Sequence, residues 1–195
     1  MIKIGLTGNI AAGKSEVEKI FNKLGVKSIC ADSIVHELFK KDSVKNEVIS
    51  LFGKDILQAN NIDRKKLGQI VFSEKEKKET LEKLIHPLVI KEINDFFEKN
   101  KTEKIVVADI PLLFESGLEY LVDKVILVYA DDKIRLERIK TRNGFDEEHI
   151  KKIMNTQLSQ EIKREKSDFV IINENKTLEM LEIDIKKIIE KLKWF

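Results

Sequence analysis

The sequence predicts an α/β protein in which helices cover a parallel sheet. Short apolar runs alternate, along most of the chain, with segments in which apolar residues recur at helical spacing. Strands that alternate with amphipathic helices form a mostly parallel sheet covered on both faces. The glycine-rich stretch GLTGNIAAGKS lies between the first strand and the first helix, and it is typical of loops that wrap a nucleotide phosphate.

The first strand is expected over residues 2–6, a β-rich run that stops at glycine. The following helix places four apolar residues on one face, at Val17, Ile20, Phe21 and Leu24. Gly25 is well placed to end this helix, because glycine adopts the left-handed conformation of a helix C-terminus without strain. The run 26–30 is expected to form the second strand.

Three later apolar runs have the character of buried strands, at 105–108, 125–129 and 169–172. Helical patterns separate them, and the last helix has apolar residues at Leu178, Leu181, Ile185, Ile188 and Leu192. The stretch 33–100 breaks the alternation, because it contains several helix-like segments and no convincing strand. We interpret it as a helical insertion that forms part of a substrate site.

Composition favours one principal soluble domain without a dedicated nucleic-acid or membrane surface. The 195 residues include 36 Lys and Arg against 34 Asp and Glu, which leaves a net charge of +2. The single cysteine, Cys30, cannot form an internal disulfide and fits a reducing compartment. No secretory pattern is seen, and no apolar run approaches the roughly 20 residues that span a bilayer. We expect a cytoplasmic, monomeric protein.

The phosphate loop, defined as residues 8–15, matches the pattern GxxxxGK[ST]. Its members are Gly8, Asn9, Ile10, Ala11, Ala12, Gly13, Lys14 and Ser15. Such a loop needs glycine because backbone N–H groups turn inward around phosphate oxygens. Lys14 would place its charge on the β and γ phosphates of ATP, and the Ser15 hydroxyl would bind Mg²⁺. The alternative is a chance glycine turn between strand and helix.

Two aspartates follow predicted strands and therefore belong to the edge of the sheet where ligands bind. Asp32 is the candidate base for a substrate hydroxyl, and an N-cap for the next helix explains its position equally well. We expect Asp32 one strand away from the phosphate loop. Asp109 could order a water on Mg²⁺, or it could merely close its strand.

Arg135, Arg138 and Arg142 fall on one face of a predicted helix. An arginine-bearing segment of this kind can neutralise a transferred phosphoryl group and exclude water. The alternative is a solvated basic face. His86 precedes Pro87 inside the insertion, and a lone histidine is more often structural than catalytic. The three histidines are too widely spaced to predict a metal cluster.

Together, six segments of the chain resemble the dephospho-coenzyme A kinase family in their order and spacing. They read GLTGNIAAGKS, ADSIVHEL, LEKLIHPLV, DIPLLFESGL, LERIKTRNGF and QLSQEIKREKSDFVIINE, and they run from the first predicted strand to the start of the last helix. The resemblance implies transfer of the ATP γ-phosphoryl group to the ribose 3′-hydroxyl of dephospho-coenzyme A, which is the last step of coenzyme A synthesis. ATP, dephospho-coenzyme A and Mg²⁺ would be the ligands.

The resemblance also implies a P-loop NTPase three-layer sandwich with a five-stranded parallel sheet, a helical substrate-binding insertion and a small lid, similar to nucleoside monophosphate kinases. The corresponding ranges are a core at 1–31, 101–137 and 167–195, an acceptor-binding insertion at 32–100 and a lid at 138–166.

Individual roles also follow from the resemblance. Asp32 would be the base, and Lys14 and Ser15 the phosphate and Mg²⁺ ligands. Arg138 and Arg142 would be the lid-side cations. Four residues would shape the acceptor pocket: His86, Leu112, Leu113 and Phe114. The chain departs from the family at Cys30, where the family often has aspartate, and at Lys152, where it often has arginine.

Two other classes of function compete with this interpretation. Another small P-loop phosphotransferase, such as a nucleoside monophosphate or shikimate-type kinase, is disfavoured by the long insertion with IHPLV and by the PLLFE segment. In a non-catalytic nucleotide-binding protein or a GTPase switch, Asp32 would have no special purpose. The sequence also has no NKxD motif for guanine binding.

Overall fold

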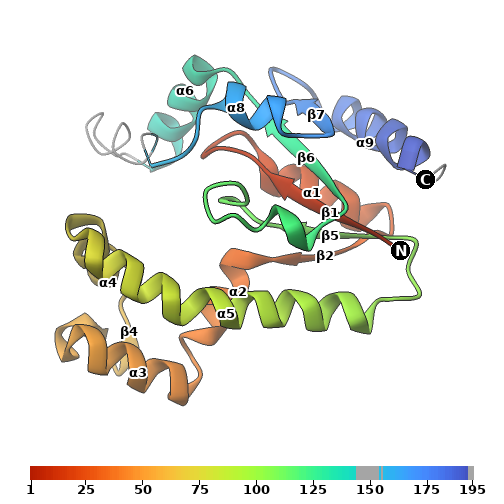
Figure 1. Ribbon diagram of the computed structural model, residues 1–195. Helices are drawn as coiled ribbons and strands as arrows, with labels where there is room; N and C mark the ends of the chain where they lie inside the picture. The colour runs from red at the N-terminus through yellow and green to blue at the C-terminus, as the bar shows by residue number, and fades with distance from the viewer. Residues whose placement is uncertain (144–153, 155, 193–195) are drawn as a thin grey trace. The chain divides into compact units, whose positions relative to one another are not determined.

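The structure is a computed structural model that describes residues 1–143, 154 and 156–192 (Figure 1). The chain divides into two compact units, of which the first contains Met1–Cys30 and Phe97–Phe195 and the second contains Ala31–Phe96. The predicted insertion had the bounds 32–100. Within the predicted lid, residues 138–143, 154 and 156–166 belong to the first unit, and the others lie outside the described residues.

The first unit is built on a five-stranded parallel sheet with the strand order β2-β5-β1-β6-β7. The strands are β1 (Ile2–Thr7), β2 (Lys27–Cys30), β5 (Ile105–Asp109), β6 (Lys124–Tyr129) and β7 (Phe169–Ile172). The predicted strands are thereby confirmed to within one residue at each end. One expectation is wrong, because β5 lies between β1 and β2, so the end of β2 is two strands away from the phosphate loop.

Helices of the first unit follow the predicted alternation: α1 (Lys14–Lys23), α6 (Asp132–Asn143), α8 (Gln160–Glu165) and α9 (Leu178–Leu192), with the short 3-10 helix η2 (Glu119–Leu121). Helices α1 and α9 pack against each other and bury their apolar faces on the sheet. The core includes Ile4, Leu6, Phe21, Ile126, Ile185 and Leu192. Gly25 follows α1 with φ 83°, which confirms its predicted place at the end of that helix.

The register brings the carboxyl ends of three strands to one edge of the sheet. Asp109, the last residue of β5, pairs with Leu6 of β1 on one side and with Cys30 of β2 on the other. The chain leaves β1 one residue later and enters the phosphate loop. Residues at the ends of β1 and β5, both in the first unit, are therefore candidates for one site, as expected for an open parallel sheet.

The second unit is mainly helical and contains α2 (Ala31–Leu38), α3 (Asp42–Phe52), the 3-10 helix η1 (Lys54–Ile56), α4 (Arg64–Ser73) and most of α5 (Lys75–Lys99). The expectation of no strand here is wrong, because β3 (Leu57–Gln58) and β4 (Asn61–Ile62) form a short antiparallel pair. Ala59 and Asn60 connect them with φ of 46° and 64°. Both values are positive, as in the tight turns that join hairpin strands.

None of the helices in the described part of the chain combines the length and the apolar character that a bilayer span requires.

Candidate active site

The phosphate loop connects the end of β1 to the first turn of α1 and depends on two glycines. A Cβ atom on Gly8 would lie 2.6 Å from the Val128 carbonyl oxygen. At Gly13, where φ is 92°, it would lie 2.0 Å from Nδ2 of Asn173. Only glycine therefore fits these two positions. The loop is thus not a chance glycine turn in which other residues would fit equally well. Helix α1 begins directly at Lys14, so the N–H groups of Lys14 and Ser15 have no acceptor within the helix, and N–H groups at a helix start are suited to bind an anion.

Lys14 is held in an ion pair with Asp109. Its Nζ lies 2.6 Å from Oδ1 and 2.7 Å from Oδ2 of the Asp109 carboxylate. The Asp109 side chain is only 2% exposed and that of Lys14 only 13%, so the pair is shielded from solvent. Asp109 therefore does more than close its strand, because it places the loop lysine. An ATP phosphate that enters the loop would share this ammonium group with Asp109.

Oxygen donors near the loop suit a hard cation such as Mg²⁺. Ser15 lies in the first turn of α1 and its side chain is exposed, so its hydroxyl is available to a cation that accompanies a nucleotide. Glu18, Cys30 and Asp109 also offer donor atoms within 4.8 Å of one another. Asp109 is engaged by Lys14, and Glu18 accepts a hydrogen bond from Ser28 at 2.9 Å. The roles of Ser15 and of Asp109 in binding Mg²⁺ stay predictions.

Two of the three arginines of α6, Arg135 and Arg138, do not form the solvated basic face considered above. Arg135 is 2% exposed; its Nε donates to the Ile10 carbonyl at 2.9 Å, and its Nη1 contacts Asp132 at 2.6 Å. Burial lowers the pKa of the Arg135 guanidinium, and the Asp132 carboxylate opposes this shift. Arg138 donates from Nη1 to the carbonyl of Ala11 at 3.2 Å. These two arginines therefore contact the backbone of the phosphate loop.

A segment within the predicted lid range 138–166 reaches the phosphate loop. The Asn9 side-chain amide donates to the Leu158 carbonyl at 3.0 Å, and the Ile10 N–H donates to Oε1 of Gln157 at 2.9 Å. Glu115 anchors this segment, because it accepts from the Leu158 N–H at 2.9 Å and pairs with Lys163 at 2.8 Å. Sequence reasoning missed these contacts, and the two that reach the loop join residues more than a hundred positions apart.

Lys163 is fully buried, an unusual place for a lysine. Burial lowers the pKa of its ammonium group, and the hydrogen bond that this group donates to the Glu115 carboxylate opposes the shift. Because Lys163 also donates to the Pro111 carbonyl at 3.4 Å, it ties the chain after β5 to α8.

The segment 112–114 only partly matches its expected role in an acceptor pocket. Leu112 is 39% exposed, so it can face a ligand. Leu113 has no exposed surface and lies where a side chain on Gly5 would clash with it, so it belongs to the core of the first unit. Phe114 is also buried, and the Lys166 ammonium lies 5.6 Å from its ring. Leu113 and Phe114 therefore pack inside the first unit, and their place in an acceptor pocket stays a prediction.

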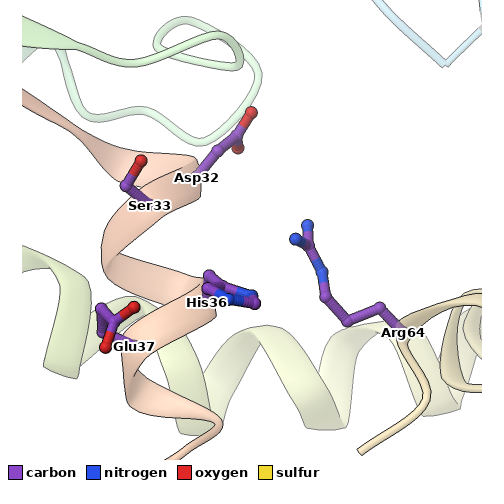
Figure 2. Close-up of a pocket in the computed structure, with 5 residues that line it drawn as sticks. All are labelled: Asp32, Ser33, His36, Glu37 and Arg64. Atoms are coloured by element: carbon purple, nitrogen blue, oxygen red, sulfur yellow. The ribbon is translucent and has the colours of Figure 1, made fainter.

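In the second unit, an open pocket of about 390 Å³ lies beside α2. Figure 2 shows its lining residues, Asp32, Ser33, His36, Glu37 and Arg64. The first four come from α2, and Arg64, the first residue of α4, extends its guanidinium toward the side of α2 that carries Asp32 and His36. Asp32 is the second residue of the helix and is exposed. It lies inside α2 rather than before it, which argues against the N-cap alternative.

Of the other predicted site residues, His86 also belongs to the second unit. His86 lies half-buried in α5, directly before Pro87, and is not among the residues that line the pocket. Arg142 lies in the last turn of α6, and its side chain is outside the described part of the structure. Lys152 also lies outside the described residues.

The chain has a parallel sheet, a phosphate loop that requires glycine after the first strand, and a loop lysine paired with Asp109 at the end of β5. These features define the class of P-loop kinases. The family model described as dephospho-CoA kinase (CoaE) matches residues 2–179. A dephospho-CoA kinase of Fusobacterium nucleatum is 45% identical over 190 residues, covering 97% of each chain. The chain belongs to the dephospho-CoA kinase family.

Solved structures agree with this assignment. A dephospho-CoA kinase from Campylobacter jejuni has a TM-score of 0.71 and 35% identity, and the match covers 97% of both chains. A protein from Thermus thermophilus has a TM-score of 0.86 and 30% identity, covering 98% of this chain and 97% of that one. Shikimate kinase from Bacteroides thetaiotaomicron, at 15% identity and a TM-score of 0.60, shares the fold alone. The shikimate-type alternative is therefore disfavoured.

Proposed function

We propose that this chain transfers the γ-phosphoryl group of ATP to the ribose 3′-hydroxyl of dephospho-coenzyme A, giving coenzyme A and ADP. The family match over residues 2–179 carries this proposal, and the geometry of the phosphate loop supports it. We further propose that the enzyme is a cytoplasmic monomer that uses Mg²⁺ with ATP.

The proposed reaction is an in-line displacement at phosphorus. The ribose oxygen forms a bond to the γ-phosphorus while the bond to the β–γ bridging oxygen breaks, and ADP leaves with that electron pair. Asp32 takes the proton of the ribose hydroxyl. Lys14 and the loop N–H groups stabilise charge on the phosphates. Mg²⁺ near Ser15 and Asp109 would neutralise the phosphate oxygens further.

An acceptor screen tests the reaction itself. The wild type should convert ATP and dephospho-coenzyme A to ADP and coenzyme A. Nucleoside monophosphates and shikimate should be poor acceptors under the same conditions. Product analysis by mass spectrometry would identify the phosphorylated acceptor. A protein that binds ATP but phosphorylates none of these acceptors would instead support a non-catalytic role.

Arg64→Ala is expected to weaken binding of the acceptor without changing binding of ATP. The acceptor carries a diphosphate, and Arg64 is the only arginine or lysine among the residues that line the described pocket. A charge-assisted hydrogen bond is worth about 1.5–3 kcal/mol, so KM for dephospho-coenzyme A should rise roughly 10- to 100-fold. Steady-state kinetics with each substrate varied in turn would measure the effect.

Lys65→Ala is the matched control, because it removes a neighbouring exposed charge that does not line the pocket. Equal KM values for both variants would reject the assignment of Arg64 to the acceptor.

Arg142→Ala is expected to lower kcat more than it weakens ATP binding. A lid arginine contacts the phosphates mainly in the closed, reacting state, so its loss removes stabilisation of the transition state. Comparing kcat with the ATP dissociation constant would separate the two effects. Arg164→Ala, which removes an exposed arginine of α8, is the control. An unchanged kcat for Arg142→Ala would assign this residue to a solvated face.

A further inference from the structure

Three consecutive carbonyl groups of the phosphate loop, those of Ile10, Ala11 and Ala12, are held by side chains from two other elements. Arg135 of α6 donates to the Ile10 carbonyl at 2.9 Å. Arg138, one turn later, donates from Nη1 to the carbonyls of Ala11 and Ala12 at 3.2 and 3.4 Å.

Asn173, the residue after β7, completes this arrangement. Its Nδ2 donates to the Ala12 carbonyl at 2.9 Å, and its own carbonyl accepts from Nη2 of Arg138 at 2.9 Å. Asn173 is 2% exposed, and its N–H continues the sheet by donating to the Tyr129 carbonyl at 2.7 Å. Its side chain is therefore fixed by the sheet on one side and touches the loop and Arg138 on the other.

Peptide geometry links these carbonyls to the groups that face a phosphate. In a planar trans peptide the C=O of one residue and the N–H of the next point in opposite directions. The contact of Arg135 with the Ile10 carbonyl therefore orients the Ala11 N–H. The contact of Asn173 with the Ala12 carbonyl likewise orients the N–H of Gly13. Both N–H groups point away from the side chains that hold the carbonyls.

Loop conformation explains why such support is needed. Ala11 has a φ of 62° and Gly13 a φ of 92°, so two residues near the middle of the loop are left-handed. A residue with a Cβ adopts this conformation only where its surroundings stabilise it. Within the loop, the Ala12 N–H donates to the Asn9 carbonyl at 3.0 Å, which closes one turn. Gln157 and Leu158 bind the loop at Ile10 and Asn9, and α6 and Asn173 support the residues that follow.

We infer that Asn173, together with Arg135 and Arg138, forms a clamp that holds the loop N–H groups in position for the β-phosphate of the nucleotide. These are positioning residues, because they act through the loop backbone. Asn173 was not among the residues predicted from the sequence. Arg138 was expected to be a lid-side cation, and in the clamp it also holds the carbonyl groups of the loop. The inference rests on the proposed use of ATP.

Asn173→Asp is the sharpest test, because aspartate keeps the shape of asparagine and replaces the donor NH₂ with an acceptor oxygen. We expect the dissociation constant of ADP to rise about tenfold or more, since a buried hydrogen bond is lost and two oxygens are opposed. AMP has no β-phosphate, so its binding should change much less. Asn173→Ala, which adds no charge, should show the same preference for weakening ADP. Calorimetric titration of ADP and competition by AMP would supply both constants.

Asn175→Asp is the control, because it makes the same change two residues away at an exposed position. It should leave both dissociation constants close to those of the wild type. Thermal unfolding would verify that each variant is folded. If Asn173→Asp does not fold, Arg138→Lys replaces it, because lysine keeps the charge but cannot bind the loop and the Asn173 carbonyl through two separate nitrogens.

A loss of ADP and AMP affinity by the same factor would overturn the clamp, as would an unchanged affinity for ADP in both Asn173 variants. These measurements need no acceptor. A wild type that binds ADP normally but does not phosphorylate dephospho-coenzyme A would reject the proposed function and leave the clamp standing.

Discussion

Lys14→Ala should leave a folded protein whose turnover is about 10² to 10³ lower than that of the wild type at saturating ATP. A preorganised cation at a place where charge develops in the transition state contributes about this much to the rate. The structure already holds the Lys14 ammonium at the loop, 2.6 Å from Asp109, so this charge is in place before a nucleotide arrives. Coupled detection of ADP would measure the turnover.

The ion pair with Asp109 makes a check of folding necessary, because removing Lys14 takes a counter-charge away from a carboxylate that is only 2% exposed. Thermal unfolding would measure this cost separately from turnover. Lys19→Ala, on the same helix and exposed, is the control for loss of a lysine from α1. Near wild-type turnover by a folded Lys14→Ala protein would exclude Lys14 from phosphate stabilisation.

Local patterns of the sequence were enough to predict the sheet and the loop. The strands are apolar runs, and glycine is required at positions 8 and 13 because neighbouring atoms leave no room for a Cβ there. These features lie within short stretches of chain, so residue type and spacing determine them. The order of the strands is different, because it depends on which segments pair across the chain. That is why the expected place of β2 beside β1 was wrong.

Contacts between distant segments explain what the sequence could not predict about the site. Asn173 and Arg138 meet the loop through hydrogen bonds that span more than a hundred residues, and no motif marks asparagine for that task. The rule that ligands bind at the carboxyl ends of strands, applied earlier to Asp32 and Asp109, would have included Asn173 had it been extended to β7.

The missed β3–β4 hairpin and the burial of Leu113 also depend on features that local sequence patterns do not show. The β3–β4 turn contains Ala59 at φ 46°, and alanine is no signal for a turn with positive φ, so the hairpin was missed. Leu113 was assigned to a pocket wall because it belongs to a family-like segment. Its burial is decided by packing near Gly5 and Val122, which its own segment does not reveal.

Asp32→Asn should keep the affinity for ATP and lose most turnover with dephospho-coenzyme A. A ribose hydroxyl is a poor nucleophile at neutral pH, and a positioned carboxylate that accepts its proton typically contributes about 10² to 10⁴ to the rate. Asp32 is exposed and lines the pocket that also contains Arg64, so a ligand in this pocket can reach it. Asparagine has nearly the same shape but cannot act as a base. Single-turnover measurements with bound ATP would report the chemical step directly.

Glu37→Gln is the matched control for this variant, because it neutralises a second carboxylate that lines the same pocket, later on the same helix. If Asp32 is the base, the control should retain turnover within a few-fold of the wild type while Asp32→Asn does not. If both variants lose the same fraction of turnover, turnover depends on the total negative charge of the pocket, and Asp32 is excluded as a specific base. If Asp32→Asn turns over as fast as the wild type, the Asp32 carboxylate only stabilises the start of α2. A negatively charged side chain in the first turn of a helix interacts favourably with the helix dipole, whatever the reaction requires.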